Sequence, residues 1–131
     1  MTPHDHATAW TGDELDHAGD TEELQLASRR PDGSLRPYVT MWVARAGRDL
    51  YVRSAYGPGN PWYRHATASG TGRVRAAGIE RDVTFAPASA EAQHDIDAAY
   101  HAKYDRYGPA IVGSVTGPAA HQVTIRLLPQ P

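Results

Sequence analysis

The chain has 131 residues and a mass of 14.2 kDa, which is the size of one ordinary domain. Hydrophobic residues make up 40% and charged residues 21%, and no apolar run approaches the roughly 20 residues that a membrane-spanning helix needs. Cysteine is absent, which excludes disulfides, thiolate nucleophiles and Cys-ligated zinc or iron–sulfur centres. The formal net charge of -2 creates no field that would attract nucleic acid or an anionic membrane, so we expect neither as a partner.

The N-terminal segment, residues 1–10, is polar and without periodicity, and it lacks the basic start and apolar stretch of a secretory signal. We therefore expect a flexible N-terminus, one folded domain over residues 11–131 and a cytoplasmic location. Thr11 is a suitable N-cap for a short helix, and the acidic residues after it favour the first turn. Gly19 is expected to end this helix after Ala18.

Alternation of period two predicts the first strands. Residues 22–28 form one strand, and the turn that follows has Gly33 at a position that requires a positive φ. Residues 35–45 are predicted as one continuous strand, with apolar side chains on both faces, and residues 50–54 as the next. Two-sided apolarity indicates a central strand that is covered on both faces by protein, a ligand or a partner subunit.

A loop rich in glycine and proline, residues 56–61, leads into a predicted short helix that begins near Pro61. Two strands over residues 72–76 and 79–85 follow, joined by a two-residue turn. The apolar positions of the next segment recur every three to four residues, which predicts one long helix.

This long helix begins at Ser89 or soon after, ends at Gly108 and Pro109, and is expected to pack on the barrel through its apolar face. A last strand over residues 123–127 closes the sheet. The elements together predict a mainly β fold, a six-stranded antiparallel barrel with about three helices.

The segment from Arg53 to Arg64 contains the features of an anion site. It combines two arginines, the Ser54 hydroxyl and a helix N-terminus, whose free N–H groups and positive dipole attract a phosphate. The alternative is a Gly/Pro turn whose arginines form surface ion pairs, and the pattern alone leaves both interpretations open.

Several other side chains could contact a planar cofactor. Trp42, Trp62 and Tyr63 could stack on a ring, although core packing is the alternative and is favoured for Trp42 in the middle of a strand. Arg36 at the head of that strand, with Thr40 further along, could meet an anion or a ring; otherwise Arg36 is a solvated turn residue.

The long helix carries histidines that do not form a metal site. His94, Asp97 and His101 fall near one helical face, but residues seven apart are separated by about 10 Å along the axis, so we predict no metal. Its tyrosines could donate protons, although their spacing is also what packing requires. No hydrolase, zincin, Walker or Rossmann motif is present, and no catalytic residue is assigned.

Four blocks in the sequence carry a family resemblance: D-G-x-x-R-P-x-V-T-x-W-V, L-Y-V-R-S-A-x-G-P, R-V-R-A-A-G-I-E-x-D-V-x-F and I-D-A-A-Y-x-A-K-Y-x-x-Y. In this order they resemble an uncharacterised bacterial family of small proteins grouped with the flavin-binding split barrels, beside pyridoxamine-phosphate oxidase-like enzymes and deazaflavin-dependent nitroreductases. The P-W-Y-R-H-A block resembles the nitroreductase group's P-W-x-x-N-L, with His65 and Ala66 in place of Asn-Leu.

The resemblance implies a split β-barrel, commonly a homodimer, with FMN or the deazaflavin F420 against the strands of residues 35–45 and 50–54. It implies an oxidoreductase that transfers a hydride to or from a small organic molecule, with the cofactor phosphate near the following helix. The candidate cofactor contacts that it implies are Arg36, Thr40, Arg53, Ser54, Trp62, Tyr63 and Arg64.

Two other classes stay open. One is a cofactor-free split barrel that binds a small molecule or catalyses a non-redox cyclisation or isomerisation, and the other is a dimeric interaction module. We expect a homodimer in each case, because Trp42 and the two-sided apolar strand offer a surface that one small barrel does not cover alone.

Overall fold

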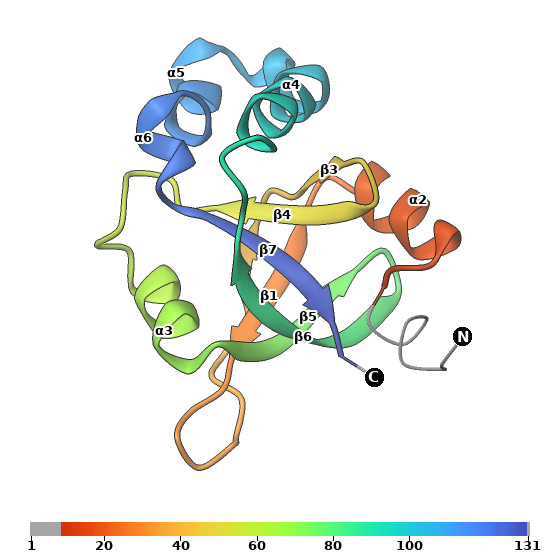
Figure 1. Ribbon diagram of the computed structural model, residues 1–131, viewed down its shortest axis with the longest axis vertical. Coiled ribbons are helices and arrows are strands. Elements are labelled where there is room, and N and C mark those ends of the chain that lie inside the picture. Colours follow the sequence, from red (N-terminus) through yellow and green to blue (C-terminus); the bar gives the residue numbers. More distant parts are fainter. Residues whose placement is uncertain (1–8, 131) are drawn as a thin grey trace.

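The structure, a computed structural model, describes residues 9–130 (Figure 1). The strands are β1 (Leu24–Ser28), β2 (Val39–Met41), β3 (Ala44–Ala46), β4 (Asp49–Arg53), β5 (Thr71–Ala76), β6 (Ile79–Pro87) and β7 (Thr124–Pro129). They form one antiparallel sheet in the order β2-β1-β5-β6-β7-β4-β3. The mainly β, antiparallel barrel class is confirmed, whereas the expected count of six strands is wrong for the described residues.

Helices lie around this sheet. They are α2 (Gly12–Asp20), α3 (Pro61–Ser69), α4 (Gln93–Tyr104), α5 (Pro109–Val112) and α6 (Pro118–His121), with 3-10 turns η1 (Asp105–Tyr107) and η2 (Gly113–Val115). In Figure 1, α4, α5 and α6 gather together, while α2 and α3 lie on opposite sides of the sheet. The part of the chain described thus has five α-helices rather than about three, two of them single turns. None of the helices in this part is long and apolar enough to cross a membrane.

The seventh strand arises because the predicted strand over residues 35–45 is broken at Trp42 and Val43. β2 pairs with β1 and β3 pairs with β4, so consecutive strands lie at opposite edges of the sheet. The backbone of Val43 bonds to side chains of α4 instead of a neighbouring strand: its N–H donates to the Tyr104 hydroxyl at 3.1 Å, and Lys103 Nζ donates to its carbonyl at 2.9 Å. The chain crosses at Trp42 and Val43 from one edge strand of the sheet, β2, to the other, β3. These two edge strands are not paired with each other, which leaves the barrel split.

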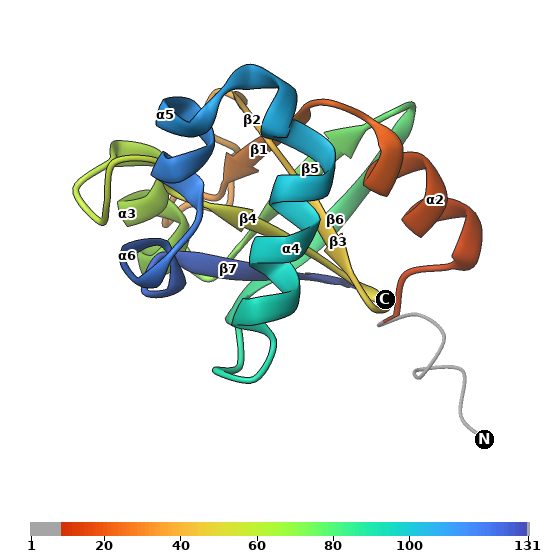
Figure 2. The same ribbon diagram turned by 90° about the horizontal axis from the view of Figure 1, so that it is seen from above.

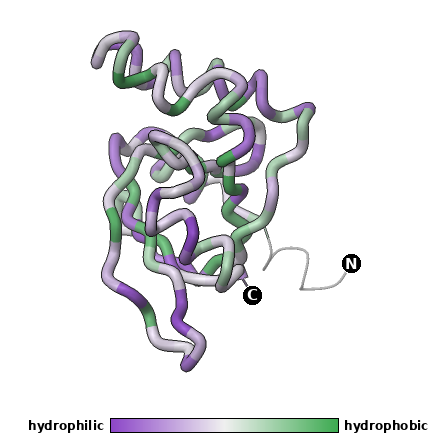
Figure 3. Tube along the Cα trace, turned by 90° about the vertical axis from the view of Figure 1, so that its left-hand side faces the viewer, coloured by the Kyte–Doolittle hydropathy of each residue, from purple (hydrophilic) through white to green (hydrophobic). Residues whose placement is uncertain are grey.

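The barrel interior is filled by the alternating apolar side chains of the strands. Leu26, Val52, Val74, Val83 and Leu127 are all buried in one cluster. Each such side chain contributes about 1.5–3 kcal/mol relative to an exposed position. In Figure 3 hydrophobic and hydrophilic segments alternate along the chain, as the buried and exposed faces of strands require.

The long helix packs on the outside of β3 and β4, as expected, and crosses them in Figure 2. A second buried cluster, which includes Tyr51, Ile96 and Tyr100, lies between them. The α-helix is shorter than predicted at both ends: a turn in which the Ser89 hydroxyl accepts from the Ala92 N–H at 3.2 Å precedes it, and the 3-10 turn η1 replaces its last residues.

The start of the described chain is docked. Trp10 is buried and its Nε1 donates to the Leu127 carbonyl at 2.9 Å. Residues 1–8, where most of the expected flexible segment falls, lie outside the described residues. Thr11 caps α2 as predicted, in a reciprocal capping box with Glu14. The helix continues past the expected end at Ala18 to Asp20. Gly19 packs closely on β3, since a Cβ there would lie 3.1 Å from a side-chain carbon of Arg45.

Candidate functional site

A cavity of about 320 Å³ lies between the edge strand β2, the end of β4, the start of α3 and the α5–η2 segment. We call it the β2–α3 cavity. Its wall is largely apolar, and the side chains that form this part are Val39, Met41, Trp42, Trp62, Ile111 and Val115. Its polar groups include Thr40, Asn60 and Ser114. The volume and the lining are those of a small-molecule pocket at the lower end of the usual size range.

The two predicted ring-stacking tryptophans both line this cavity. Trp42 is stacked on Tyr104, with ring centroids 4.0 Å apart and an interplanar angle of 3°. Trp62 is buried at the start of α3 and meets Tyr63 edge to face at 5.9 Å. Core packing therefore fixes both indoles in place, while part of each still faces the cavity.

Arg53 lies where expected but does not have the predicted role. A guanidinium has five N–H donors, and all five of Arg53 are used: Nε to Thr124 Oγ1, Nη1 to Asp97 Oδ1 and the Val115 carbonyl, and Nη2 to the Gln93 carbonyl and Oε1. The distances run from 2.5 to 3.4 Å, and the side chain is fully buried. No donor is left for a phosphate, so Arg53 holds the wall of the cavity rather than gripping a ligand.

Other predicted contacts lie outside the β2–α3 cavity. Ser54 is buried and its hydroxyl donates to the Gly57 carbonyl at 2.6 Å, which fixes the turn after β4. Arg64 is exposed on α3, and within residues 9–130 its guanidinium makes no hydrogen bond or ion pair. Tyr63 lines a different cavity, of about 390 Å³, between α3, the end of β6 and the α6–β7 junction; we call this the α3–α6 cavity.

Arg36 lies in a third cavity, of about 500 Å³, which Arg29 and Arg30 also line. Its backbone N–H donates to the Ser28 carbonyl at 2.9 Å, and its Nε atom is buried with no partner in the described chain. The structure therefore gathers Thr40, Arg53 and Trp62 around one cavity and separates them from the other four predicted residues.

The N-terminus of α3 opens beside the β2–α3 cavity. Asn60 is the N-cap, and its side chain makes no capping bond. Its carbonyl accepts from Tyr63 N and Arg64 N, which leaves the Trp62 N–H, next to Pro61, without an acceptor inside the helix. Asn60 before Pro61 is a signal that sequence reasoning missed.

The α5–η2 wall was also missed. Ile111, Ser114 and Val115 lie on single turns with no periodicity that could have indicated them.

The phenols of α4 serve packing. Burial raises the pKa of Tyr104 to about 12, and its hydroxyl donates to the Glu22 carbonyl at 2.6 Å. At neutral pH this group stays protonated and is engaged by the backbone, so it is not a proton donor for a ligand.

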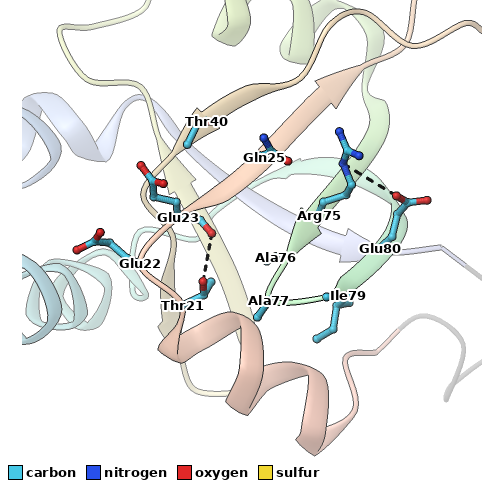
Figure 4. Close-up of a pocket in the computed structure, with 11 residues that line it drawn as sticks. Thr21, Glu22, Glu23, Gln25, Thr40, Arg75, Ala76, Ala77, Ile79 and Glu80 are labelled. Carbon is cyan, nitrogen blue, oxygen red and sulfur yellow. Dashed lines mark hydrogen bonds and ion pairs between the residues drawn. The ribbon is translucent and has the colours of Figure 1, made fainter.

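A depression of about 460 Å³ lies at the β5–β6 turn and also reaches Thr40 (Figure 4). Acidic side chains, Glu22, Glu23 and Glu80, line it with Arg75, which is already engaged with Glu80 at 4.0 Å and stacks over Tyr38 at 3.6 Å. Mixed, paired charges are typical of a solvated surface, and the β2–α3 cavity is the better candidate site.

Comparison with known proteins identifies a family. Residues 14–127 match the family DUF2255, described as an uncharacterized protein conserved in bacteria. A search of curated proteins gives no match.

Three solved structures share the fold. A conserved hypothetical protein from Mycobacterium tuberculosis aligns with a TM-score of 0.66 at 14% identity, over 99% of this chain and 87% of that one. A FAD-binding protein from Mesorhizobium loti aligns with a TM-score of 0.56 at 17% identity, over 94% and 92%. An F420 reductase aligns with a TM-score of 0.51 at 20% identity, over 89% and 91%.

Proposed function

The chain belongs to the bacterial family DUF2255, and we propose that it is an oxidoreductase that binds FMN or the deazaflavin F420 in the β2–α3 cavity and acts on a small organic molecule. The observation that supports this most strongly is the pair of indoles, Trp42 and Trp62, held in one apolar cavity beside a helix N-terminus. The shared fold of the FAD-binding protein and the F420 reductase agrees with the proposal.

The residues present fit the ring system of such a cofactor. Aromatic and aliphatic walls offer contact area for a planar heterocycle, and the Thr40 hydroxyl and the Asn60 amide offer hydrogen bonds to its polar edge. When bound, the cofactor would supply hydride transfer. The task of the chain's own residues is to bind it, orient it and exclude water.

The phosphate has weaker support. Arg53 has no free donor, so the Trp62 N–H and the Asn60 side chain would hold an anion, with the exposed Arg64 one turn further along α3. A site of this kind depends on backbone dipoles more than on a fixed cation, and we expect micromolar rather than nanomolar affinity.

A second copy of the chain is the proposed cover for the cavity. Within residues 9–130 the large apolar side chains with notable exposure are Val39, Tyr56, Tyr107 and Ile111, and all except Tyr107 line the β2–α3 cavity. Exposed apolar side chains that gather around a pocket are typical of an interface. A homodimer that buries them would also narrow the mouth of the cavity and exclude water from the ring.

The test is a titration of the purified protein with FMN and with oxidised and reduced F420, in which fluorescence and calorimetry measure binding. Thr40→Val and Asn60→Ala are expected to weaken binding about tenfold, because each removes one hydrogen bond at the cavity. Thr67→Val is the matched control, since Thr67 lies on α3 but lines the α3–α6 cavity. No binding at tens of micromolar would overturn the proposal.

A cofactor-free small-molecule site is the second candidate function. The full engagement of Arg53 favours it, because the cavity then has apolar walls and no free guanidinium for a phosphate. In that case neither FMN nor F420 would bind. An apolar dye would bind in the β2–α3 cavity of the wild type, and Ile111→Arg would weaken that binding.

A further inference from the structure

The α3–α6 cavity contains a histidine that is bound and oriented by a carboxylate. The side chain of His121 lines this cavity and is one third exposed, and its Nε2 lies 2.8 Å from Asp97 Oδ2. An ionised carboxylate only accepts, so Nε2 carries a proton, and in the neutral imidazole Nδ1 then keeps its lone pair. Nδ1 makes no hydrogen bond to the described chain, which leaves it available to a molecule in the cavity.

Asp97 is itself fixed in place. Its other oxygen, Oδ1, accepts from Arg53 Nη1 at 2.5 Å, and Arg53 is buried with every donor engaged. Burial acts to raise the pKa of Asp97, but hydrogen bonds from His121 and Arg53 outweigh it and lower that pKa. The carboxylate therefore stays ionised and cannot turn away from the imidazole.

A second His–Asp pair, between His101 of α4 and Asp105 of η1, provides a comparison. His101 Nδ1 lies 2.7 Å from Asp105 Oδ1, a contact of almost the same length. That pair is exposed, at 51% and 63%, and has no buried arginine behind it. The chain thus has one His–Asp pair fixed at a cavity and one in solvent.

The cavity walls define the kind of ligand. Tyr63 and Phe85 contribute rings, and Pro87 and Ile125 contribute aliphatic surface. His121 and Tyr63 are the titratable side chains among its lining residues, and no carboxylate, lysine or arginine is present among them. Such a cavity fits a small, planar, neutral molecule.

We propose that this is a proton-transfer site, in which His121 is the general base and Asp97 is a positioning residue. Nδ1 takes a proton from an acidic C–H of the ligand, the C–H electron pair moves into the adjacent unsaturated group, and the imidazolium returns the proton at another atom. The net change is an isomerisation that needs no other reactant. This site goes beyond the oxidoreductase function and uses a different cavity.

The probe is 5-nitrobenzisoxazole, tested with the full chain and without any flavin. A base removes the carbon-bound proton of its isoxazole ring, the C–H electrons form a nitrile, and the N–O bond breaks to give a coloured phenolate. We expect a saturable rate above buffer that falls at least about tenfold in His121→Gln. His101→Gln, the matched control in the exposed pair, is expected to leave the rate unchanged.

Glutamine at position 121 can still donate to Asp97, so His121→Gln is expected to fold, and circular dichroism checks this. No rate above buffer in the wild type, or a full rate in folded His121→Gln, would overturn the proposal. Because the assay contains no cofactor, its failure is separate from a failure of flavin binding.

The positioning role of Asp97 has its own readout. Proton–nitrogen correlation NMR reports which imidazole nitrogen carries the proton, and we expect Nε2–H for His121 in the wild type. Asp97→Asn places an amide donor against Nε2, so the tautomer should change to Nδ1–H and the probe rate should fall with it. A wild-type His121 found as Nδ1–H would overturn the proposal even if Asp97→Asn does not fold.

Discussion

The two cavities beside α3 have different lining residues, but the same buried arginine, Arg53, supports both of them. The β2–α3 cavity has indole and aliphatic walls with an exposed apolar rim, whereas the α3–α6 cavity holds an oriented imidazole. Consecutive residues of α3, Trp62 and Tyr63, face one cavity each, and Arg53 lines the first while fixing Asp97 of the second. One buried side chain thus supports two chemically different sites without serving as a ligand contact in either.

The largest expected effect comes from removing this shared support. Arg53→Ala leaves Asp97, Gln93 and Thr124 without their buried partner, and it should reduce the free energy of unfolding by about 3–5 kcal/mol. Urea denaturation measures this change. Arg64→Ala, an exposed arginine on α3, should change it by less than about 0.5 kcal/mol. Equal effects of the two substitutions would show that Arg53 is not a support.

Tyr104→Phe is expected to affect the β2–α3 cavity and to leave the α3–α6 cavity unchanged. It leaves the buried Val43 N–H without its acceptor at the chain crossing that carries Trp42, and it should reduce the free energy of unfolding by about 1–3 kcal/mol. Flavin titration should show weaker binding, because the wall of the β2–α3 cavity shifts, while the probe reaction at His121 should be unaffected. Loss of the probe reaction alone would contradict this division.

Ile111→Arg should affect the β2–α3 side only. A charge at the exposed apolar rim is expected to convert the proposed homodimer to a monomer, which sedimentation velocity measures. Ala119→Arg, an exposed position on α6 outside this cavity, should leave the mass unchanged. A monomeric wild type would contradict the interface.

The smallest effect concerns acid stability on the α3–α6 side. The pKa of Asp97 is lowered from its ordinary value of 3.8, so its contribution to stability is complete above pH 3.8 and is lost as the pH falls through the lower folded value. The stability difference between wild type and Asp97→Asn, measured by urea denaturation, should therefore shrink below pH 3.8. A difference that is the same at neutral and acid pH would exclude this account of the Asp97 ion pairs.

Much of the barrel could be predicted from local patterns, and the failures have physical reasons. β5 and β6 were predicted with the two-residue turn between them, because β5 alternates and Gly78 permits the positive φ that this turn needs. Ala77 also has a positive φ, which its residue type does not indicate. The break at Val43 could not be seen, because its backbone partner is the hydroxyl of Tyr104, 61 residues along the chain.

The same limit applies to the site. Thr40 and Trp62 were expected as cofactor contacts from the family resemblance, and the structure places both at the β2–α3 cavity, where the cofactor role stays a prediction. Arg53 was placed correctly with the wrong role, since nothing in its own segment shows that Gln93, Asp97 and Thr124 converge on it. His121 could not be singled out, because its partner Asp97 is 24 residues earlier.

The most direct test of the central claim uses the three tryptophans of the chain as reporters. Their indole N–H resonances are assigned by single substitutions, and FMN or F420 is then added. We predict that the signals of Trp42 and Trp62, which line the β2–α3 cavity, shift on binding, while that of Trp10, bonded to the Leu127 carbonyl, stays in place. Binding that moves none of the three, or Trp10 alone, would contradict a cofactor site in this cavity.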